Sequence, residues 1–297
     1  MNILIINAAN PLGWSIANFL NRELDCNINI IASNKDNTLF YDKAVFDSAN
    51  LFINEDIYSR NYIKKIIYEV SPDIIINSTF FNDINNVNNE KNKYWNQIVG
   101  LNEIIIRSAL VTGSHFITFS SENVFNGLNG PYYTNVNPEP TDFYGKCYLA
   151  VENLLRSVYD KSTVIRITNY YGYTPYGFGY YPDKIMNEKN IKIFSNYFTN
   201  PVFLDDIAIA VYKIIEKKIY GLLNASGKDY LSLLAFANSF ISYMNLYNSC
   251  FTIEDRLEQD KFYGLVNLET ETKLPMQFSN LYDGISSLRY LFNLDME

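Results

Sequence analysis

Short runs of consecutive apolar residues alternate along the first half of the chain with segments of helical period. The apolar runs lie at 3–6, 28–32, 51–53, 74–76, 116–119 and 164–167. Such runs are typical of strands buried on both faces of a sheet. Apolar residues at the spacing of an amphipathic helix occur between them, at 13–22, 59–70 and 94–110. This alternation predicts a parallel sheet with right-handed crossover helices.

The pattern changes in the second half of the chain. Residues 170–181 are rich in Tyr and Gly and show no clear period. Asp205 and Asp206 then stand where an N-cap is expected, before a helix with one apolar face, and a further helix is predicted over 233–243. The second half therefore contains helices but no repetition of the strand–helix alternation.

We predict an α/β fold with a doubly wound parallel sheet and a smaller C-terminal α/β lobe. The nucleotide-binding domain is expected over 1–168 and the substrate-binding lobe over 169–297, with 200–220 packing back on the first domain. In sheets of this kind ligands bind in the crevice at the carboxyl ends of the strands. The second lobe is expected to close over that crevice.

Composition narrows the class of protein. The chain has 297 residues, a net charge of −8 and no cluster of Lys or Arg, which argues against a nucleic-acid surface. Cys26, Cys147, Cys250 and the single His115 are too scattered to give the spacing of a metal site. We expect a reducing, cytoplasmic setting, and the opening apolar run is too short for a membrane span.

The loop after the first apolar run is a candidate for binding the phosphates of a dinucleotide. Such a turn commonly has glycines at three-residue intervals, which here fall on Asn7, Asn10 and Gly13. Asn tolerates positive φ, so the backbone path can persist, but the side chain of Asn10 lies where phosphate should approach. Pro11 adds no N–H, and Leu12 completes the loop. An ordinary strand–helix turn remains the alternative.

Residues after the next two strands bear on the choice of cofactor. An acidic residue after the second strand would bind a free ribose 2′-hydroxyl, but the chain has Asn34 and Lys35, which suit a 2′-phosphate better. NADP is therefore favoured over NAD, although both residues could simply be solvated. Asp56 and Ile57 follow the third strand, where an adenine contact is plausible. The alternative for Asp56 is capping of the helix that begins near residue 59.

The segment 120–148 contains the layout of a hydride-transfer site. A strand ends in serines that include Ser121, and a Pro-rich loop leads into a helix that begins with Tyr144. Such a tyrosine needs a lysine one turn later, because a nearby positive charge stabilises tyrosinate. That position is occupied by Tyr148, whereas Lys146 lies about 200° around the helix from Tyr144.

Six segments together resemble the extended short-chain dehydrogenases/reductases of the dTDP-4-dehydrorhamnose reductase type. They are SPDIIINST, FSSENVFNG, NPEPTDFYGK, RITNYYG, NPVFLDDIA and GLLNASG, and their order covers nearly the whole chain. The resemblance implies a Rossmann-type fold, an NADP or NAD cofactor and a 4-keto nucleotide-sugar substrate. It also implies a homodimer, without nucleic-acid or membrane partners, in surface polysaccharide biosynthesis.

The resemblance assigns roles to the catalytic segment. Tyr144 matches the proton-donating tyrosine, and Ser121 matches the residue that hydrogen-bonds the substrate carbonyl. Glu122 stands for an aspartate and keeps a carboxylate with longer reach. Asn123 replaces a tyrosine near the substrate. Tyr148 replaces the family's lysine, which also holds the nicotinamide ribose.

Further positions are implied around the cofactor and substrate. Ser78 and Thr79 match small residues that lie against the cofactor, and Thr168 follows the sixth strand near the nicotinamide. Asn169 and Tyr171 belong to the substrate side, where the loop 170–181 would cover the sugar nucleotide. An Arg-Pro pair that the family often carries near its substrate has no counterpart around 262–274.

Other interpretations remain open. Tyr144 belongs to an apolar stripe and could be part of a buried helix face, and Ser121 could cap local backbone. The stripe comprises Tyr144, Cys147, Tyr148, Val151, Leu154, Leu155 and Val158. We place a reductase first. The alternatives are a nucleotide-binding regulatory or structural subunit that has lost hydride transfer, and an enzyme that uses Glu122 and Tyr144 as an acid/base pair on an activated sugar.

Overall fold

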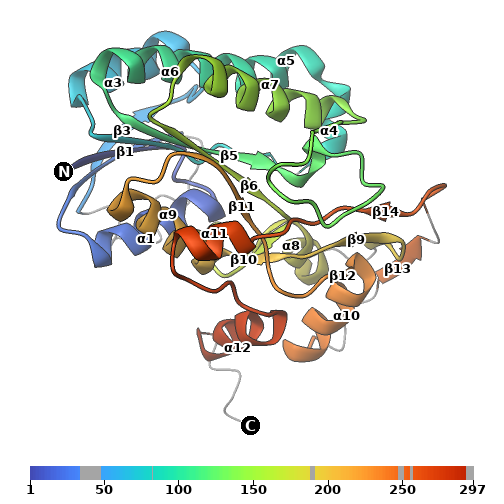
Figure 1. Cartoon of the computed structure of the whole chain (residues 1–297). Helices are drawn as coiled ribbons and strands as arrows, with labels where there is room; N and C mark the ends of the chain where they lie inside the picture. Colours follow the sequence, from blue (N-terminus) through green and yellow to red (C-terminus); the bar gives the residue numbers. More distant parts are fainter. Residues whose placement is uncertain (34–47, 82, 188–190, 247–250, 255–256, 292–297) are drawn as a thin grey trace.

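A computed structural model describes residues 1–33, 48–81, 83–187, 191–246, 251–254 and 257–291. Asn34 and Lys35, the candidates for contact with the ribose, lie outside these residues. A parallel sheet forms the centre of the molecule (Figure 1). Its strands are β1 (Asn2–Ile6), β2 (Asn27–Ser33), β3 (Asn50–Asn54), β4 (Ile74–Asn77), β5 (His115–Ser121), β6 (Ser162–Ile167) and β11 (Gly221–Ala225).

The sheet has the order β11-β6-β5-β4-β1-β2-β3, and every neighbouring pair is parallel. The six strands predicted from apolar runs are confirmed. The seventh, β11, adds an edge beside β6 and comes from the second half of the chain. The order reverses between β1 and β4, so the loops that follow these two strands open on a shared crevice.

Helices cover both faces of the sheet (Figure 1). The helices of the first domain are α1 (Pro11–Glu23), α3 (Arg60–Val70), α4 (Ile84–Asn89), α5 (Lys91–Trp95), α6 (Leu101–Thr112) and α7 (Phe143–Val158). One apolar core lies between the sheet and α3, α6 and α7. The other lies between the sheet and α1 together with α9 (Leu204–Lys217).

The helix predicted over 94–110 is interrupted. A π-helical turn, η2 (Asn96–Gly100), lies between α5 and α6. Gly100 faces the guanidinium of Arg60, whose Nη2 would be 2.3 Å from a Cβ at that position. Arg60 also donates to Asn96 at 3.3 Å. The irregular turn thus lies where Arg60 of α3 packs against it. Helical periodicity predicted an uninterrupted helix and gave no sign of this turn.

Asp205 and Asp206 lie in the first turn of α9 and do not cap it, because the cap position is Phe203. Instead they fasten other segments. Asp205 accepts a hydrogen bond from Ser15 of α1 at 3.3 Å. Asp206 accepts from the N–H and hydroxyl of Ser279 at 2.7 and 3.1 Å. The predicted capping role was wrong, and both carboxylates join α9 to its neighbours.

The remaining elements form small sheets and helices beside the strand ends. The strands are β7 (Tyr170–Tyr171), β8 (Ile191–Phe194), β9 (Tyr197–Thr199), β10 (Val202–Phe203), β12 (Leu231–Ser232), β13 (Phe251–Glu254) and β14 (Lys261–Phe262). The helices are α8 (Tyr180–Asn187), α10 (Leu233–Tyr243), α11 (Leu268–Lys273) and α12 (Leu281–Leu291). A third apolar core joins α8, α10 and α12. Across the described residues, no helix is both long and apolar enough to cross a membrane.

Candidate active site

The loop between β1 and α1 keeps the backbone path of a phosphate-binding turn. Asn7 has φ of 63°, in the left-handed region that Asn tolerates. Gly13 is packed so closely that a Cβ would lie 2.3 Å from Ser78 Oγ and 2.7 Å from Asn7 O. Gly13 therefore serves the close approach of helix and strand expected of the third glycine in such loops.

The side chain of Asn10 caps α1. Its Oδ1 accepts a hydrogen bond from the Gly13 N–H at 3.0 Å. Its Nδ2 donates to the carbonyl oxygen of Asn7 and to that of Ser78, the latter at 3.3 Å. Pro11 occupies the first helical position, where its missing N–H costs nothing. The helix thus begins two residues earlier than its apolar period indicated.

The loop after β4 supplies one used and one unused hydroxyl. Ser78 donates to the carbonyl oxygens of Ile6 and Asn7 at 2.8 and 2.9 Å, so its hydroxyl holds the two loops together. Thr79 is buried, and its Oγ1 has no hydrogen-bond partner within the described residues. A buried hydroxyl without a partner is unfavourable unless a ligand supplies one.

Asp56 and Ile57 lie at the start of the connection to α3. The Asp56 carboxylate accepts from the Tyr58 N–H at 2.9 Å, and Ile57 is buried in the core beneath α3. The helix cap itself is Ser59, whose side chain makes no capping bond. Asp56 therefore stabilises the turn before the helix. This role resembles the capping role that was the alternative to an adenine contact, although Asp56 is not the cap residue.

The end of β5 places Ser121 and Asn123 inside the protein. Ser121 donates to Asn123 Oδ1 at 3.0 Å and accepts from the Asn123 N–H at 3.2 Å. This is the local cap that remained as the alternative for Ser121. Burial raises the pKa of the Tyr144 phenol, and the nearby Ser121 hydroxyl opposes only part of that shift. The fold thus brings the predicted serine and tyrosine together.

Glu122 is a buried carboxylate whose partners are all neutral. Its Oε2 accepts from the Thr199 hydroxyl at 2.6 Å and the Gly264 N–H at 2.7 Å, and its Oε1 accepts from Asn169 Nδ2 at 3.4 Å. Burial raises the pKa of Glu122 to about 7, and these hydrogen bonds only partly oppose that shift. The group can therefore exchange a proton near neutral pH.

Tyr144 and Tyr148 both bind the main chain of Phe81. The Tyr144 hydroxyl donates to the Phe81 carbonyl at 2.7 Å, and the Tyr148 oxygen accepts from the Phe81 N–H at 3.1 Å. Their rings meet edge to face with centroids 4.9 Å apart. Burial is the largest cause that raises the pKa of each phenol, and the proximity of Tyr148 raises that of Tyr144 further. Both phenols are therefore protonated at neutral pH.

The aromatic residues after β4 were not predicted as part of the site. Phe80 packs on Tyr148 with ring centroids 5.4 Å apart, and Phe81 lies against Tyr94 at 5.0 Å. Lys146 is exposed, as its place on the helix predicted. Where the family's pattern has a lysine, this protein therefore has an aromatic cluster. A phenylalanine pair after a strand is a signal of burial and gave no indication of this contact.

The remaining predicted residues divide between the crevice and the core. Thr168 donates to the Asn200 carbonyl at 2.7 Å, which ties the end of β6 to the segment before β10. Asn169 reaches Glu122, as described. Tyr171 is fully buried among Phe203 and Phe236 in the core of the small lobe. The structure therefore places Tyr171 away from the position expected for a substrate contact.

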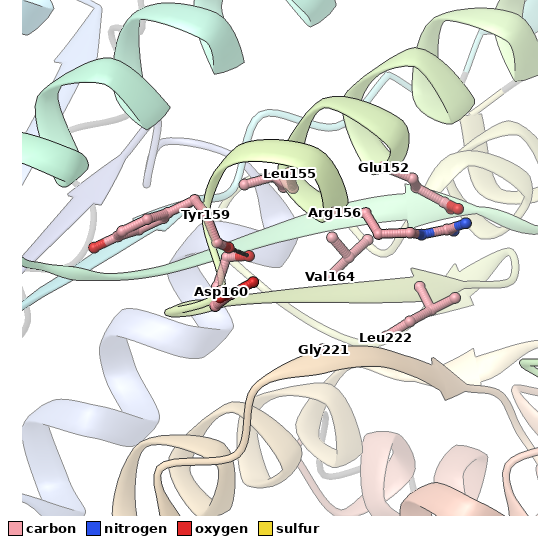
Figure 2. Close-up of a pocket in the computed structure, with 9 residues that line it drawn as sticks. Glu152, Leu155, Arg156, Tyr159, Asp160, Val164, Gly221 and Leu222 are labelled. Carbon is pink, nitrogen blue, oxygen red and sulfur yellow. Dashed lines mark hydrogen bonds between the residues drawn. The ribbon is translucent and has the colours of Figure 1, made fainter.

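Two cavities lie near α1 and α7. One of about 400 Å³ joins Pro11, at the N-terminus of α1, to Tyr176, Tyr180 and Lys184 of the loop and helix that face it. Figure 2 shows another, of about 170 Å³, where the C-terminal half of α7 meets β6 and β11. Tyr144 and Tyr148 lie in the N-terminal half of α7, away from the cavity of Figure 2. The cavity at Pro11 lies at the N-terminus of α1, beside the candidate phosphate loop.

Comparison with known proteins gives a consistent family. The model of the RmlD substrate binding domain matches residues 1–259. Spore coat polysaccharide biosynthesis protein SpsK of Bacillus subtilis is 26% identical over 189 residues, which are 63% of this chain and 66% of that protein. Methionine adenosyltransferase 2 subunit beta of Bos taurus is 24% identical over 217 residues, which are 67% of this chain and 62% of that protein. These matches thus span just under two thirds of the relatives' own length.

A solved structure extends the likeness of the fold to nearly the whole chain. The dTDP-4-dehydrorhamnose reductase of Bacillus anthracis, in complex with NADP, superposes with a TM-score of 0.76 at 16% identity. The match covers 98% of this chain and 99% of that one. At this identity the likeness concerns the fold.

Proposed function

Because the chain belongs to the family of the RmlD substrate binding domain, we propose that it is a nicotinamide-dependent reductase of a 4-keto nucleotide sugar. The proposed role is in carbohydrate or surface polysaccharide biosynthesis, in the cytoplasm and as a homodimer. The observation that carries the proposal is that the fold buries Ser121, at the end of β5, and Tyr144, in the first turn of α7, near each other. A serine and a phenol that can reach the same oxygen form the minimum needed to hold and protonate a carbonyl.

The cofactor is proposed to lie across the loops that follow β1 and β4. The backbone at Asn7 and Gly13 would accept a diphosphate once the Asn10 side chain has moved, and Thr79 offers a buried hydroxyl with no partner among the described residues. When bound, a reduced nicotinamide would supply the hydride that the protein's own residues cannot. NADP is favoured over NAD because Asn34 and Lys35 suit a ribose 2′-phosphate better than a free hydroxyl.

The proposed proton donor is Tyr144. Its raised pKa keeps the phenol protonated, which suits a donor in the reductive direction. Ser121 would orient the carbonyl oxygen, and as hydride adds to the carbonyl carbon, Tyr144 would protonate the oxygen. The phenol must first leave the Phe81 carbonyl, to which it donates at 2.7 Å. Glu122, with a pKa of about 7, is proposed as the nearby group that exchanges protons.

The test begins with direct titration of NADPH and NADH by calorimetry. Binding of either cofactor is expected, and no binding of either at millimolar concentration would contradict the proposal. Reduction of dTDP-4-dehydrorhamnose is then compared among wild type, Tyr144→Phe and Tyr159→Phe. Loss of the proton donor should lower turnover by about 10²-fold or more. Tyr159→Phe is the matched control. Tyr159 lies just beyond the C-terminus of α7, far from Tyr144 along that helix, and its hydroxyl donates to the Ala109 carbonyl of α6.

A regulatory or structural subunit without hydride transfer is the second candidate. The observation that favours it is Tyr148, whose hydroxyl holds the Phe81 N–H where the family's pattern has a lysine. Reduction of the sugar nucleotide by wild type would contradict this candidate, and Tyr148→Lys identifies the cause if wild type binds the cofactor but is silent. Gain of reduction would show that the missing ammonium alone silences the site. Cofactor binding without any gain would favour the subunit, or the non-redox chemistry of Glu122 with Tyr144.

A further inference from the structure

The Asn10 side chain makes three hydrogen bonds, two within its own loop and one to the loop after β4. Its carbonyl oxygen accepts from the Gly13 N–H, and its amide donates to the carbonyl oxygens of Asn7 and Ser78. Three partners from both loops of the crevice therefore hold one side chain. Moving this side chain out of the loop breaks all three hydrogen bonds and therefore costs free energy.

Asn10 also occupies the amides that a diphosphate would use. A helix N-terminus binds anions through its unpaired N–H groups. In α1 Pro11 has none, the Gly13 N–H is bound to the side-chain Oδ1 of Asn10, and the Trp14 N–H makes the ordinary helical bond to the main-chain carbonyl of Asn10 at 2.9 Å. In the first turn of α1, all of it within the described residues, Leu12 alone keeps an N–H without a hydrogen-bond partner.

We propose that the Asn10 side chain is an internal competitor of the cofactor's diphosphate. It closes the cradle at the N-terminus of α1, and a dinucleotide binds only after this side chain has rotated away. The inference rests on the proposed function and deepens it, since it assigns to one residue the control of cofactor affinity. The competent state is the minor one, so the apparent affinity is lowered by its population.

The energetic consequence follows from the contacts. In the empty protein Asn10 stabilises the start of α1, and on binding these hydrogen bonds are lost and must be replaced by those of the diphosphate. Asn10→Gly removes the competitor and restores the glycine that allows close approach of phosphate. Because the same hydrogen bonds stabilise the empty protein, the melting temperature of empty Asn10→Gly should fall, although Gly remains a tolerated N-cap. Cofactor affinity should rise by about tenfold or more.

The experiment measures the dissociation constants of NADPH and NADH for wild type, Asn10→Gly and Ser232→Gly, with the melting temperature of each empty protein. Ser232 is the matched control because its hydroxyl caps α10 by accepting from the Ala235 N–H at 3.1 Å, in the small lobe. Both variants lose an N-cap side chain. Only Asn10→Gly should tighten cofactor binding, while Ser232→Gly should keep the wild-type constant.

The outcomes separate this inference from the proposed function. Tighter binding by Asn10→Gly alone supports the inference, as does binding by that variant when wild type shows none. Equal constants for wild type and Asn10→Gly overturn the inference while the cofactor site stands. Weaker binding by Asn10→Gly also overturns it, because Asn10 would then hold the cofactor. If no protein binds either dinucleotide, the proposed function fails and the competitor has nothing to exclude.

Discussion

Two buried glutamates near β5 show how the same residue type can serve different ends. Glu152 of α7 binds Arg166 through both oxygens, at 2.9 and 2.7 Å, and accepts from the Ser120 hydroxyl at 2.6 Å. Glu122 accepts from the Thr199 hydroxyl at the same 2.6 Å, but none of its partners within the described residues is a cation. Their burial is alike, at 2% and 1% exposed, and their charge balance differs.

The difference has a physical meaning. The Glu152 carboxylate meets its counter-charge inside the sheet domain, and the Arg166 guanidinium also lies 4.9 Å from the centre of the Phe125 ring. This network is complete and holds the core. Glu122 is left without a counter-charge at the junction with the small lobe, where burial raises its pKa to about 7. A buried carboxyl with a perturbed pKa is a candidate functional group, whereas a satisfied ion pair is typical of structure.

The largest expected effect comes from breaking the complete network. Glu152→Gln leaves the Arg166 guanidinium buried without its counter-charge, so the free energy of unfolding should fall by about 3–5 kcal/mol. Urea denaturation at neutral pH measures this loss. A loss below about 1 kcal/mol would show that the ion pair is not what distinguishes the two glutamates.

Glu122→Gln should act through pH. The folded-state pKa of Glu122 is raised from 4.5 to about 7, so its protonated form stabilises the fold. That contribution is fully present below about pH 4.5 and is lost as pH rises through about 7, a change on the order of 3 kcal/mol. Removing the charge should flatten this dependence. The check is urea denaturation of both proteins between pH 5 and 8, and parallel curves would contradict the assignment.

A matched pair of hydroxyl deletions sharpens the comparison further. Ser120→Ala and Thr199→Val each remove one donor to a buried carboxylate, for which about 1.5–3 kcal/mol is expected when the acceptor is charged. The Ser120 loss should be the same at pH 6 and pH 8. The Thr199 loss should be larger at pH 8, because its hydrogen bond lowers the pKa of Glu122 and its absence raises that pKa further. Thermal unfolding at both pH values provides the test, and equal pH dependence would refute it.

The smallest expected effect concerns the longest hydrogen bond of Glu122. Asn169 donates to its Oε1 at 3.4 Å, near the limit for such a bond. Asn169→Ala should cost about 0.5–1 kcal/mol, less than Thr199→Val at the same pH. The two variants are compared by chemical denaturation at pH 8. A cost for Asn169→Ala that exceeds the cost for Thr199→Val would reverse the ranking of these donors.

Much of the fold could be predicted from local pattern. Apolar runs marked the six strands from β1 to β6, and helical spacing placed Tyr144 and Tyr148 on one buried face of α7. The exposure of Lys146 followed from the same geometry. The edge strand β11 was missed because it lies beyond the strand–helix alternation. The π-helical turn before α6 was missed because it accompanies packing by Arg60 from another helix.

The candidate site was predictable in its residues and less so in their partners. The nearness of Ser121 to Tyr144 agrees with the motif that carries both residues. The contact of Tyr148 with the Phe81 N–H joins residues 67 positions apart and had no signal in the chain. Likewise Tyr171, expected at the substrate, lies in the core of the small lobe. Spacing predicts which side chains share a face, but not which distant backbone they meet.

The sequence by itself determined the parallel sheet, the family and the loss of two features of its pattern, the second glycine and the lysine. These follow from backbone periodicity and residue type, which act over a few positions. Only the tertiary structure decided what the replacements do. Asn10 closes the loop by bonding to Ser78 across 68 positions, and Glu122 reaches Thr199 and Gly264 across 77 and 142. Such partners depend on how the lobes pack, because burial and hydrogen-bond geometry are set by elements that are distant in the chain.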